Sequence, residues 1–181
     1  MIDNNAVKKC LSTPELHRQF LNDLGSDFIL ISDIEQKPLL ILHKQFAETV
    51  YKVYIYNCTN PPGGRQLDEY KIQLKLPGQR EGERGVLDES DGTIILIVGF
   101  ANYDCVDNGV WIIWDTSRHI SFAFNANLQV KAGMIIGTTT KCVFCTKKRG
   151  NGEVVVLSDR SHLKEAIDLR LKNDLEVLLG D

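Results

Sequence analysis

The sequence predicts an α+β fold in which a mostly antiparallel, barrel-like sheet is flanked by one helix near each end of the chain. Apolar residues at helical spacing occur in residues 13–24 and 161–179, whereas the region between them, about 27–157, contains many short apolar runs separated by turn signals. The length of 181 residues, with 43% hydrophobic and 25% charged residues, is typical of a soluble globular protein that buries its own core. We therefore interpret residues 1–181 as one domain.

The first helix has a clear start signal. Residues 12–15, Ser-Thr-Pro-Glu, match a capping box with proline in the first turn. Leu16, Phe20 and Leu24 follow at helical spacing, and Gly25 can end the helix. The sequence therefore predicts a helix over residues 13–24.

The next elements are predicted as strands with less regular patterns. Residues 28–32 form a short apolar run, and residues 39–55 are ambiguous between a helix and a strand, or one followed by the other. Residues 53–56 favour a strand, and residues 57–65 (NCTNPPGGR) are a turn cluster by composition.

The segment of residues 69–76 alternates strictly between apolar and polar residues, which predicts a half-buried strand. Its apolar face carries Tyr70, Ile72, Leu74 and Leu76. Its polar face carries Glu69, Lys71, Gln73 and Lys75.

Two runs, residues 93–100 and 110–114, are apolar at consecutive positions, which predicts central strands covered on both faces. The charged, glycine-bearing residues 77–91 predict an exposed loop. Phe122 and Phe124 suggest a further strand.

The last third of the chain predicts short strands, a hairpin and a helix. Residues 134–136, 143–145 and 154–157 are apolar runs that we interpret as strands, and residues 149–152 (RGNG) are a plausible hairpin turn. Residues 161–179 predict a final helix, which Ser158 or Ser161 can cap and Gly180 can end. Its apolar stripe is Leu163, Ile167, Leu171, Leu175 and Leu178.

Residues 116–152 form an unusual window. They contain no Asp or Glu but six Lys and Arg, so their formal charge is +6 in a chain of net charge −3. Acid returns on both sides, at Asp115 and Glu153. An acid-free window predicts a local positive field that attracts polyanions.

Amide side chains lie inside and beside this window, and amides can read the donor and acceptor edges of bases in the major groove. Lysines and arginines would neutralise phosphates. We therefore predict a site-specific double-stranded DNA-binding surface. Its expected residues are Arg65, Lys71, Gln73, Lys75, Arg118, His119, Asn125, Asn127, Gln129, Lys131, Lys147, Lys148 and Arg149.

Glu69-x-Lys71 supports an alternative, a metal-dependent nuclease of the PD-(D/E)XK type. There a carboxylate holds Mg²⁺ and the lysine supports the attacking water. Period two places both side chains on one face, but no second acid occurs between residues 57 and 67. A magnesium cofactor is expected only under this alternative, and no catalytic residue or cofactor otherwise.

Three further features suggest other roles. Cys142 and Cys145 form half of a zinc site, for which structural zinc requires four ligands. A sensor of modified bases would need an aromatic pocket, and the candidates for it are Trp111, Trp114, Phe122 and Phe124. The five cysteines, the absence of a signal-peptide pattern and the absence of a membrane-length apolar run predict a protein of the reducing cytoplasm.

Four pieces of sequence carry a resemblance to a known group of proteins. They are GGRQLDEYKIQLKL, DGTIILIVGF, VWIIWDTSRH and NLQVKAG, within residues 54–133. They resemble proteins encoded beside DNA methyltransferases in bacterial restriction-modification systems. The positions that match the pattern are Gly63, Gly64, Arg65, Glu69, Tyr70, Lys71, Gln73, Arg118, His119 and Gln129.

This resemblance implies the target-recognition (effector) domain of a restriction endonuclease, with a DNA-binding pseudobarrel fold and a nuclease domain or subunit as partner. Two departures from the pattern matter. Lys71 stands where arginine is more usual, which weakens bidentate recognition of guanine, and residues 125–127 (Asn-Ala-Asn) replace a serine-rich stretch.

Overall fold

The computed structural model describes residues 10–45, 49–60, 68–102, 106–141 and 143–180. The α-helices in these residues are α1 (Thr13–Leu24), α2 (Ala132–Lys141) and α3 (Leu163–Leu179). The strands are β1 (Phe28–Leu30), β2 (Leu39–His43), β3 (Val50–Asn57), β4 (Glu69–Leu74), β5 (Arg84–Val86), β6 (Ile94–Ala101), β7 (Val110–Ile113), β8 (Ser121–Ala123), β9 (Ala126–Lys131), β10 (Phe144–Lys148) and β11 (Val154–Asp159). Short 3₁₀ turns are η1 (Val106–Asn108), η2 (Thr116–His119) and η3 (Arg160–His162).

The strands form one large sheet and two small ribbons. The large sheet has seven strands in the order β1-β2-β3-β6-β7-β11-β10, and β4–β9 and β5–β8 are separate two-stranded ribbons. Within the large sheet β3 and β6 run parallel and the other pairs are antiparallel, which confirms a mostly antiparallel α+β fold. The sheet is open, with β1 and β10 at its edges, so the expected closure into a barrel is not confirmed.

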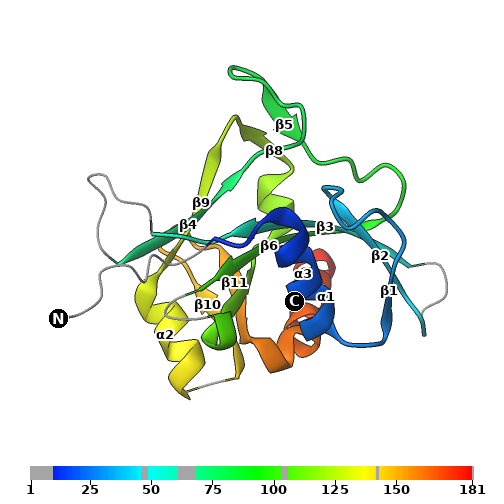
Figure 1. Ribbon diagram of the computed structural model, residues 1–181. Coiled ribbons are helices and arrows are strands. Elements are labelled where there is room, and N and C mark those ends of the chain that lie inside the picture. Colours follow the sequence, from blue (N-terminus) through cyan, green and yellow to red (C-terminus); the bar gives the residue numbers. More distant parts are fainter. Residues whose placement is uncertain (1–9, 46–48, 61–67, 103–105, 142, 181) are drawn as a thin grey trace.

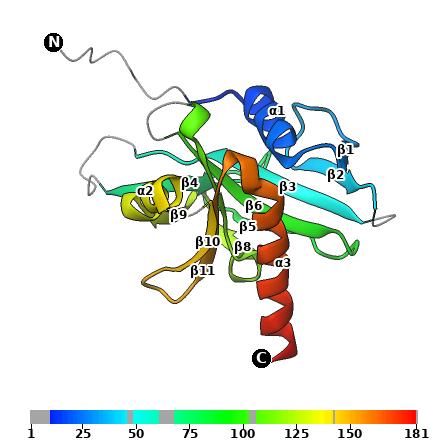
Figure 2. The same ribbon diagram turned by 90° about the horizontal axis from the view of Figure 1, so that it is seen from below.

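The large sheet separates two hydrophobic cores, because its central strands are apolar on both faces. Ile97 and Ile112 face the two ribbons and α2, whereas Val98 and Ile113 face α1 and α3. Figure 1 shows both ribbons on one side of the sheet, and Figure 2 shows α3 leaving the sheet beside the β10–β11 hairpin. The prediction of central strands in residues 93–100 and 110–114 is thereby confirmed.

Helix α1 forms as predicted. The Ser12 backbone N–H donates to the Glu15 carboxylate at 2.8 Å, which completes the capping box, and Gly25 ends the helix at a φ of 86°. Helix α3 differs at its start: the Asp159 carboxylate, not Ser158 or Ser161, caps η3, and α3 follows without a side-chain cap of its own. Gly180 ends α3 in the left-handed conformation, as expected.

The structure resolves one ambiguity and corrects two other expectations. In the region that was ambiguous between helix and strand, Leu39–His43 and Val50–Asn57 form the strands β2 and β3. Residues 134–136 lie in helix α2 and not in a strand. The apolar run of residues 134–136 is too short to show a period, whereas helical packing buries Ile135 and Thr138, three residues apart. The expected loop at residues 77–91 contains the short strand β5.

Candidate nucleic-acid interface

The β4–β9 ribbon brings two separated polar segments of the chain onto one face. In this antiparallel pair Lys71 lies opposite Gln129, Gln73 opposite Asn127 and Glu69 opposite Lys131. No element was predicted for the residues of strand β9, although they alternate between polar and apolar types. We call these six outward residues the ribbon face: Glu69, Lys71, Gln73, Asn127, Gln129 and Lys131.

The opposite face of this ribbon anchors it to the sheet. Tyr70, Ile72, Leu128 and Val130 are buried in the core beneath it. Gly99 of β6 allows the close approach, because a Cβ atom there would lie 2.9 Å from the Ile72 side chain. The packing therefore fixes which side of the ribbon faces outward, and a shift of register by one residue would bury the amides instead.

Gln73 and Gln129 differ in their contacts from Asn127 and from the charged groups of the ribbon face. Lys71 Nζ donates to Asn127 Oδ1 at 2.9 Å, and Lys131 Nζ lies 3.1 Å from Glu69 Oε1. This contact with Glu69 is the main reason why the pKa of Lys131 is raised. Within the described part of the chain the amide side chains of Gln73 and Gln129 make no hydrogen bond. Each can therefore donate to and accept from a ligand.

Lys75 and Asn125 lie at the end of the ribbon that adjoins the turn between β8 and β9. Lys75 Nζ stands 4.5 Å from the centre of the Phe124 ring, a cation–π contact, and Lys75 is exposed. Asn125 has a φ of 55°, in the left-handed region, which asparagine tolerates in a turn. The structure therefore places both predicted residues at the end of the ribbon nearest β8.

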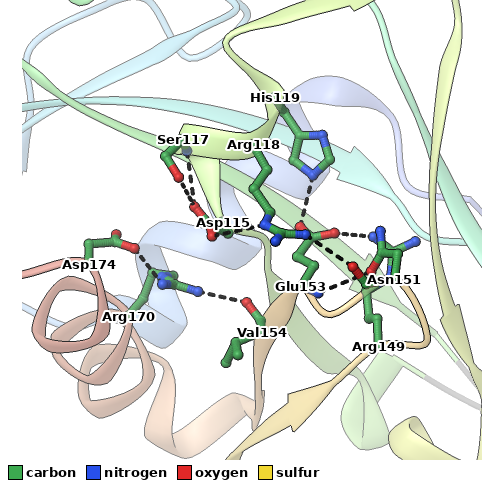
Figure 3. A network of polar contacts seen from close by, with 10 residues as sticks. All are labelled: Asp115, Ser117, Arg118, His119, Arg149, Asn151, Glu153, Val154, Arg170 and Asp174. Atoms are coloured by element: carbon green, nitrogen blue, oxygen red, sulfur yellow. Dashed lines mark hydrogen bonds and ion pairs between the residues drawn. The ribbon is translucent and has the colours of Figure 1, made fainter. Parts of the chain in front are cut away.

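A second group of predicted residues meets a buried carboxylate. Glu153 is fully buried, its Oε1 lies 2.8 Å from His119 Nε2, and its other oxygen pairs with the Arg149 guanidinium (Figure 3). The Glu153 backbone N–H donates to Asn151 Oδ1 at 3.1 Å. We call His119, Arg149 and Glu153 the Glu153 cluster. Burial raises the pKa of Glu153, but His119 and Arg149 outweigh it and hold this pKa below its ordinary value.

Arg118 is also engaged by the protein itself. Its Nη1 donates to the Asn151 carbonyl oxygen at 3.3 Å, and its Nε lies 3.9 Å from Asp115 Oδ2 (Figure 3). Asp115 and Glu153 are the two acids that border the acid-free window in the sequence. The fold returns both of them to the window, so the window is not acid-free in three dimensions.

The lysines of the β10–β11 hairpin complete the predicted set. Lys148 is exposed and Lys147 is half-buried, opposite Val154 and Val155 of β11. A cavity of about 270 Å³ joins this hairpin to the ribbon, since Gln129 and Arg149 both line it. The hairpin therefore borders the β9 edge of the ribbon face.

The remaining expectations concern residues that the structure does not describe, metal binding and the nuclease alternative. Gly63, Gly64, Arg65 and Cys142 lie outside the described residues. In the ranges that the structure describes, no group of three or more His, Cys, Asp or Glu side chains could hold a metal ion. Glu69 and Lys71 do share one face, as the nuclease alternative requires.

The aromatic residues considered for a modified-base pocket are mostly core residues. Trp111 and Trp114 are fully buried, on opposite faces of the large sheet, and Phe122 is buried beside Trp114. Phe124 is half-buried under Lys75. These four rings therefore line no common pocket.

Comparison with known proteins identifies one family. A sequence model of the family described as methylase-associated X1 matches residues 49–167, which include β3 to β11 and the start of α3. No curated protein matches the chain, and no solved structure matches it. None of the helices in the described ranges has the length and apolar character needed to cross a bilayer.

Proposed function

The chain belongs to the methylase-associated X1 family, and we propose that it is a site-specific double-stranded DNA-binding module of a restriction-modification system. In this proposal the module reads a short target sequence in the major groove. A nuclease domain or subunit of the same system, acting with the methyltransferase, supplies the cleavage chemistry.

The observation that carries the proposal is the ribbon face. A two-stranded antiparallel ribbon is one of the two elements that fit the major groove of B-DNA. This ribbon presents three amides, Gln73, Asn127 and Gln129, beside Lys71 on its outer face. Glutamine and asparagine recognise adenine through paired hydrogen bonds, so we expect at least one adenine in the target.

The neighbouring lysines are suited to phosphate contacts, which position the module but carry no sequence information. Lys75 at one end of the ribbon and Lys148 on the hairpin are exposed. Arg118, His119 and Arg149, which the sequence also suggested for this role, are engaged by Asp115, Asn151 and Glu153. We therefore assign them to holding the hairpin, not to contacting DNA.

Selection from a random duplex pool, followed by affinity measurements at about 150 mM salt, tests the proposal. We expect one enriched sequence, bound at least about 1,000-fold more tightly than scrambled duplexes. Replacing Gln129 by Ala should reduce this discrimination by about 1–3 kcal/mol and leave the affinity for scrambled duplexes unchanged.

Gln45→Ala is the matched control, since Gln45 is an exposed glutamine that follows β2, outside the ribbon face. It should bind the selected and the scrambled duplexes as the parent does. Equal affinity of the parent protein for all duplexes would contradict base reading.

A further inference from the structure

A pocket that the sequence did not suggest lies along the β4 edge of the ribbon face. It has a volume of about 350 Å³ and lies between the first turn of α1, the residue before Pro38, and strands β3 and β4. The polar residues that line it include Thr13, Lys37, Tyr56, Thr59, Lys71 and Gln73.

The charged residues that the structure describes in the lining of this pocket are all basic. They are Lys37 and Lys71, and none of the described lining residues is Asp or Glu. Lys37 Nζ lies 3.7 Å from the centre of the Tyr56 ring, and no carboxylate of the described chain forms an ion pair with it. Burial lowers the pKa of Lys37 to about 8, as expected for an ammonium group removed from water without a counter-ion. A cation held in this way favours an anionic ligand.

The surrounding contacts hold the pocket in shape. The Asn57 side chain accepts from the Leu11 backbone N–H at 3.0 Å and donates to its carbonyl oxygen at 2.8 Å, which ties the start of α1 to β3. Tyr56 donates its hydroxyl to the Lys75 carbonyl oxygen at 3.0 Å. Thr13, the first residue of α1, lines the pocket, and the Glu15 carboxylate of the same turn is engaged by Ser12 in the capping box.

The pocket adjoins the ribbon face, because Lys71 and Gln73 belong to both. We propose that it binds a phosphoryl group, namely a backbone phosphate of the DNA whose bases meet the ribbon face, with Lys37 as the principal cation. This inference rests on the proposed function. It adds a subsite formed by Lys37, Thr13 and Thr59, none of which the family resemblance includes.

The salt dependence of duplex binding tests the subsite. Each phosphate contact contributes about 0.9 to the slope of log affinity against log salt concentration. Lys37→Met should therefore lower this slope by about 0.9 and weaken selected and scrambled duplexes equally. Lys37→Arg, which keeps the charge, should preserve the slope of the parent. Lys44→Met, at an exposed lysine at the opposite end of β2, is the matched control and should leave the slope unchanged.

A second measurement uses the unmodified protein and so does not depend on the folding of a variant. The lysines are acetylated with an amine-reactive ester, and the modified positions are quantified by mass spectrometry with and without ligand. Bound duplex should protect Lys37 and leave the control Lys44 reactive. Inorganic phosphate alone, in a separate arm, shows whether a free phosphoryl group is sufficient for protection.

The outcomes separate the two proposals. If duplexes bind, Lys37 stays reactive and Lys37→Met keeps the full slope, the subsite is wrong and the DNA-binding proposal stands. If no duplex binds but inorganic phosphate protects Lys37, the pocket is an anion site and the DNA-binding proposal fails. If neither ligand protects Lys37, the phosphoryl site is overturned.

Discussion

The ribbon face and the Glu153 cluster both draw on the acid-free window of residues 116–152, yet they differ in what surrounds their polar groups. In the Glu153 cluster, Arg149 and His119 converge on one fully buried carboxylate. On the ribbon face, Gln129 lies on the outer surface, and its amide has no partner in the described part of the chain. One part of the window therefore stabilises the fold, and the other is available to a ligand.

Local charge in a sequence is therefore a poor guide to charge at a surface. Glu153 follows the window directly and is brought back onto it by the hairpin turn at residues 149–152, in which the Arg149 N–H donates to the Glu153 carbonyl oxygen at 2.7 Å. A hairpin places residues on either side of its turn face to face, so an acid just outside a basic stretch becomes its nearest counter-charge.

Removing the carboxylate of the Glu153 cluster should give the largest effect. Glu153→Gln leaves Arg149 and His119 without their buried partner, and we expect a loss of about 3 kcal/mol in the free energy of unfolding. Urea unfolding measures this change. Glu83→Gln, at an exposed acid in the β4–β5 loop, is the control and should change stability by less than about 0.5 kcal/mol. A loss of similar size in both variants would contradict the structural role of Glu153.

Lowering the pH should reduce the stabilisation that the Glu153 cluster gives to the folded protein. The folded-state pKa of Glu153 lies below its ordinary value of 4.5, so the unfolded chain binds a proton more readily than the folded chain in that range. The stabilisation by Glu153 is therefore fully present above pH 4.5 and is lost as the pH falls through the lower, folded-state value. Unfolding free energies measured above and below pH 4.5 should show a smaller acid-induced loss in Glu153→Gln than in the parent. Equal losses would show that other carboxylates account for the acid sensitivity.

Variants of two adjacent cations in the hairpin, Lys148 and Arg149, should differ in their effects on stability and on DNA binding. Lys148 is exposed, so Lys148→Ala should change the unfolding free energy by less than about 0.5 kcal/mol and lower the salt slope of duplex binding by about 0.9. Arg149→Ala should instead destabilise the protein, because its partner Glu153 stays buried. Paired unfolding and binding measurements on the two variants check this contrast, which fails if Lys148→Ala is the less stable of the two.

Local patterns in the sequence were sufficient for several elements. The capping box at Ser12 and Glu15, the glycine that follows each terminal helix and the alternation from Glu69 to Leu74 all predict the observed structure. They succeed because a helix cap and a half-buried strand depend on neighbours within a few residues. The prediction of a strand at residues 134–136, which lie in α2, is wrong because three apolar residues show no period.

Patterns along the sequence are enough to predict the α+β architecture and to place Lys71 and Gln73 on one face of a strand. Three further features arise only when the chain is folded: Gln129 and Asn127 lie opposite them, Glu153 neutralises Arg149, and Lys37 lines a pocket in which none of the described residues is an acid. The two kinds of feature differ in the separation along the chain of the residues that produce them. Caps and strand alternation arise from adjacent residues, whereas strand register, counter-charges and pockets arise when residues distant in the chain are packed together around a common core.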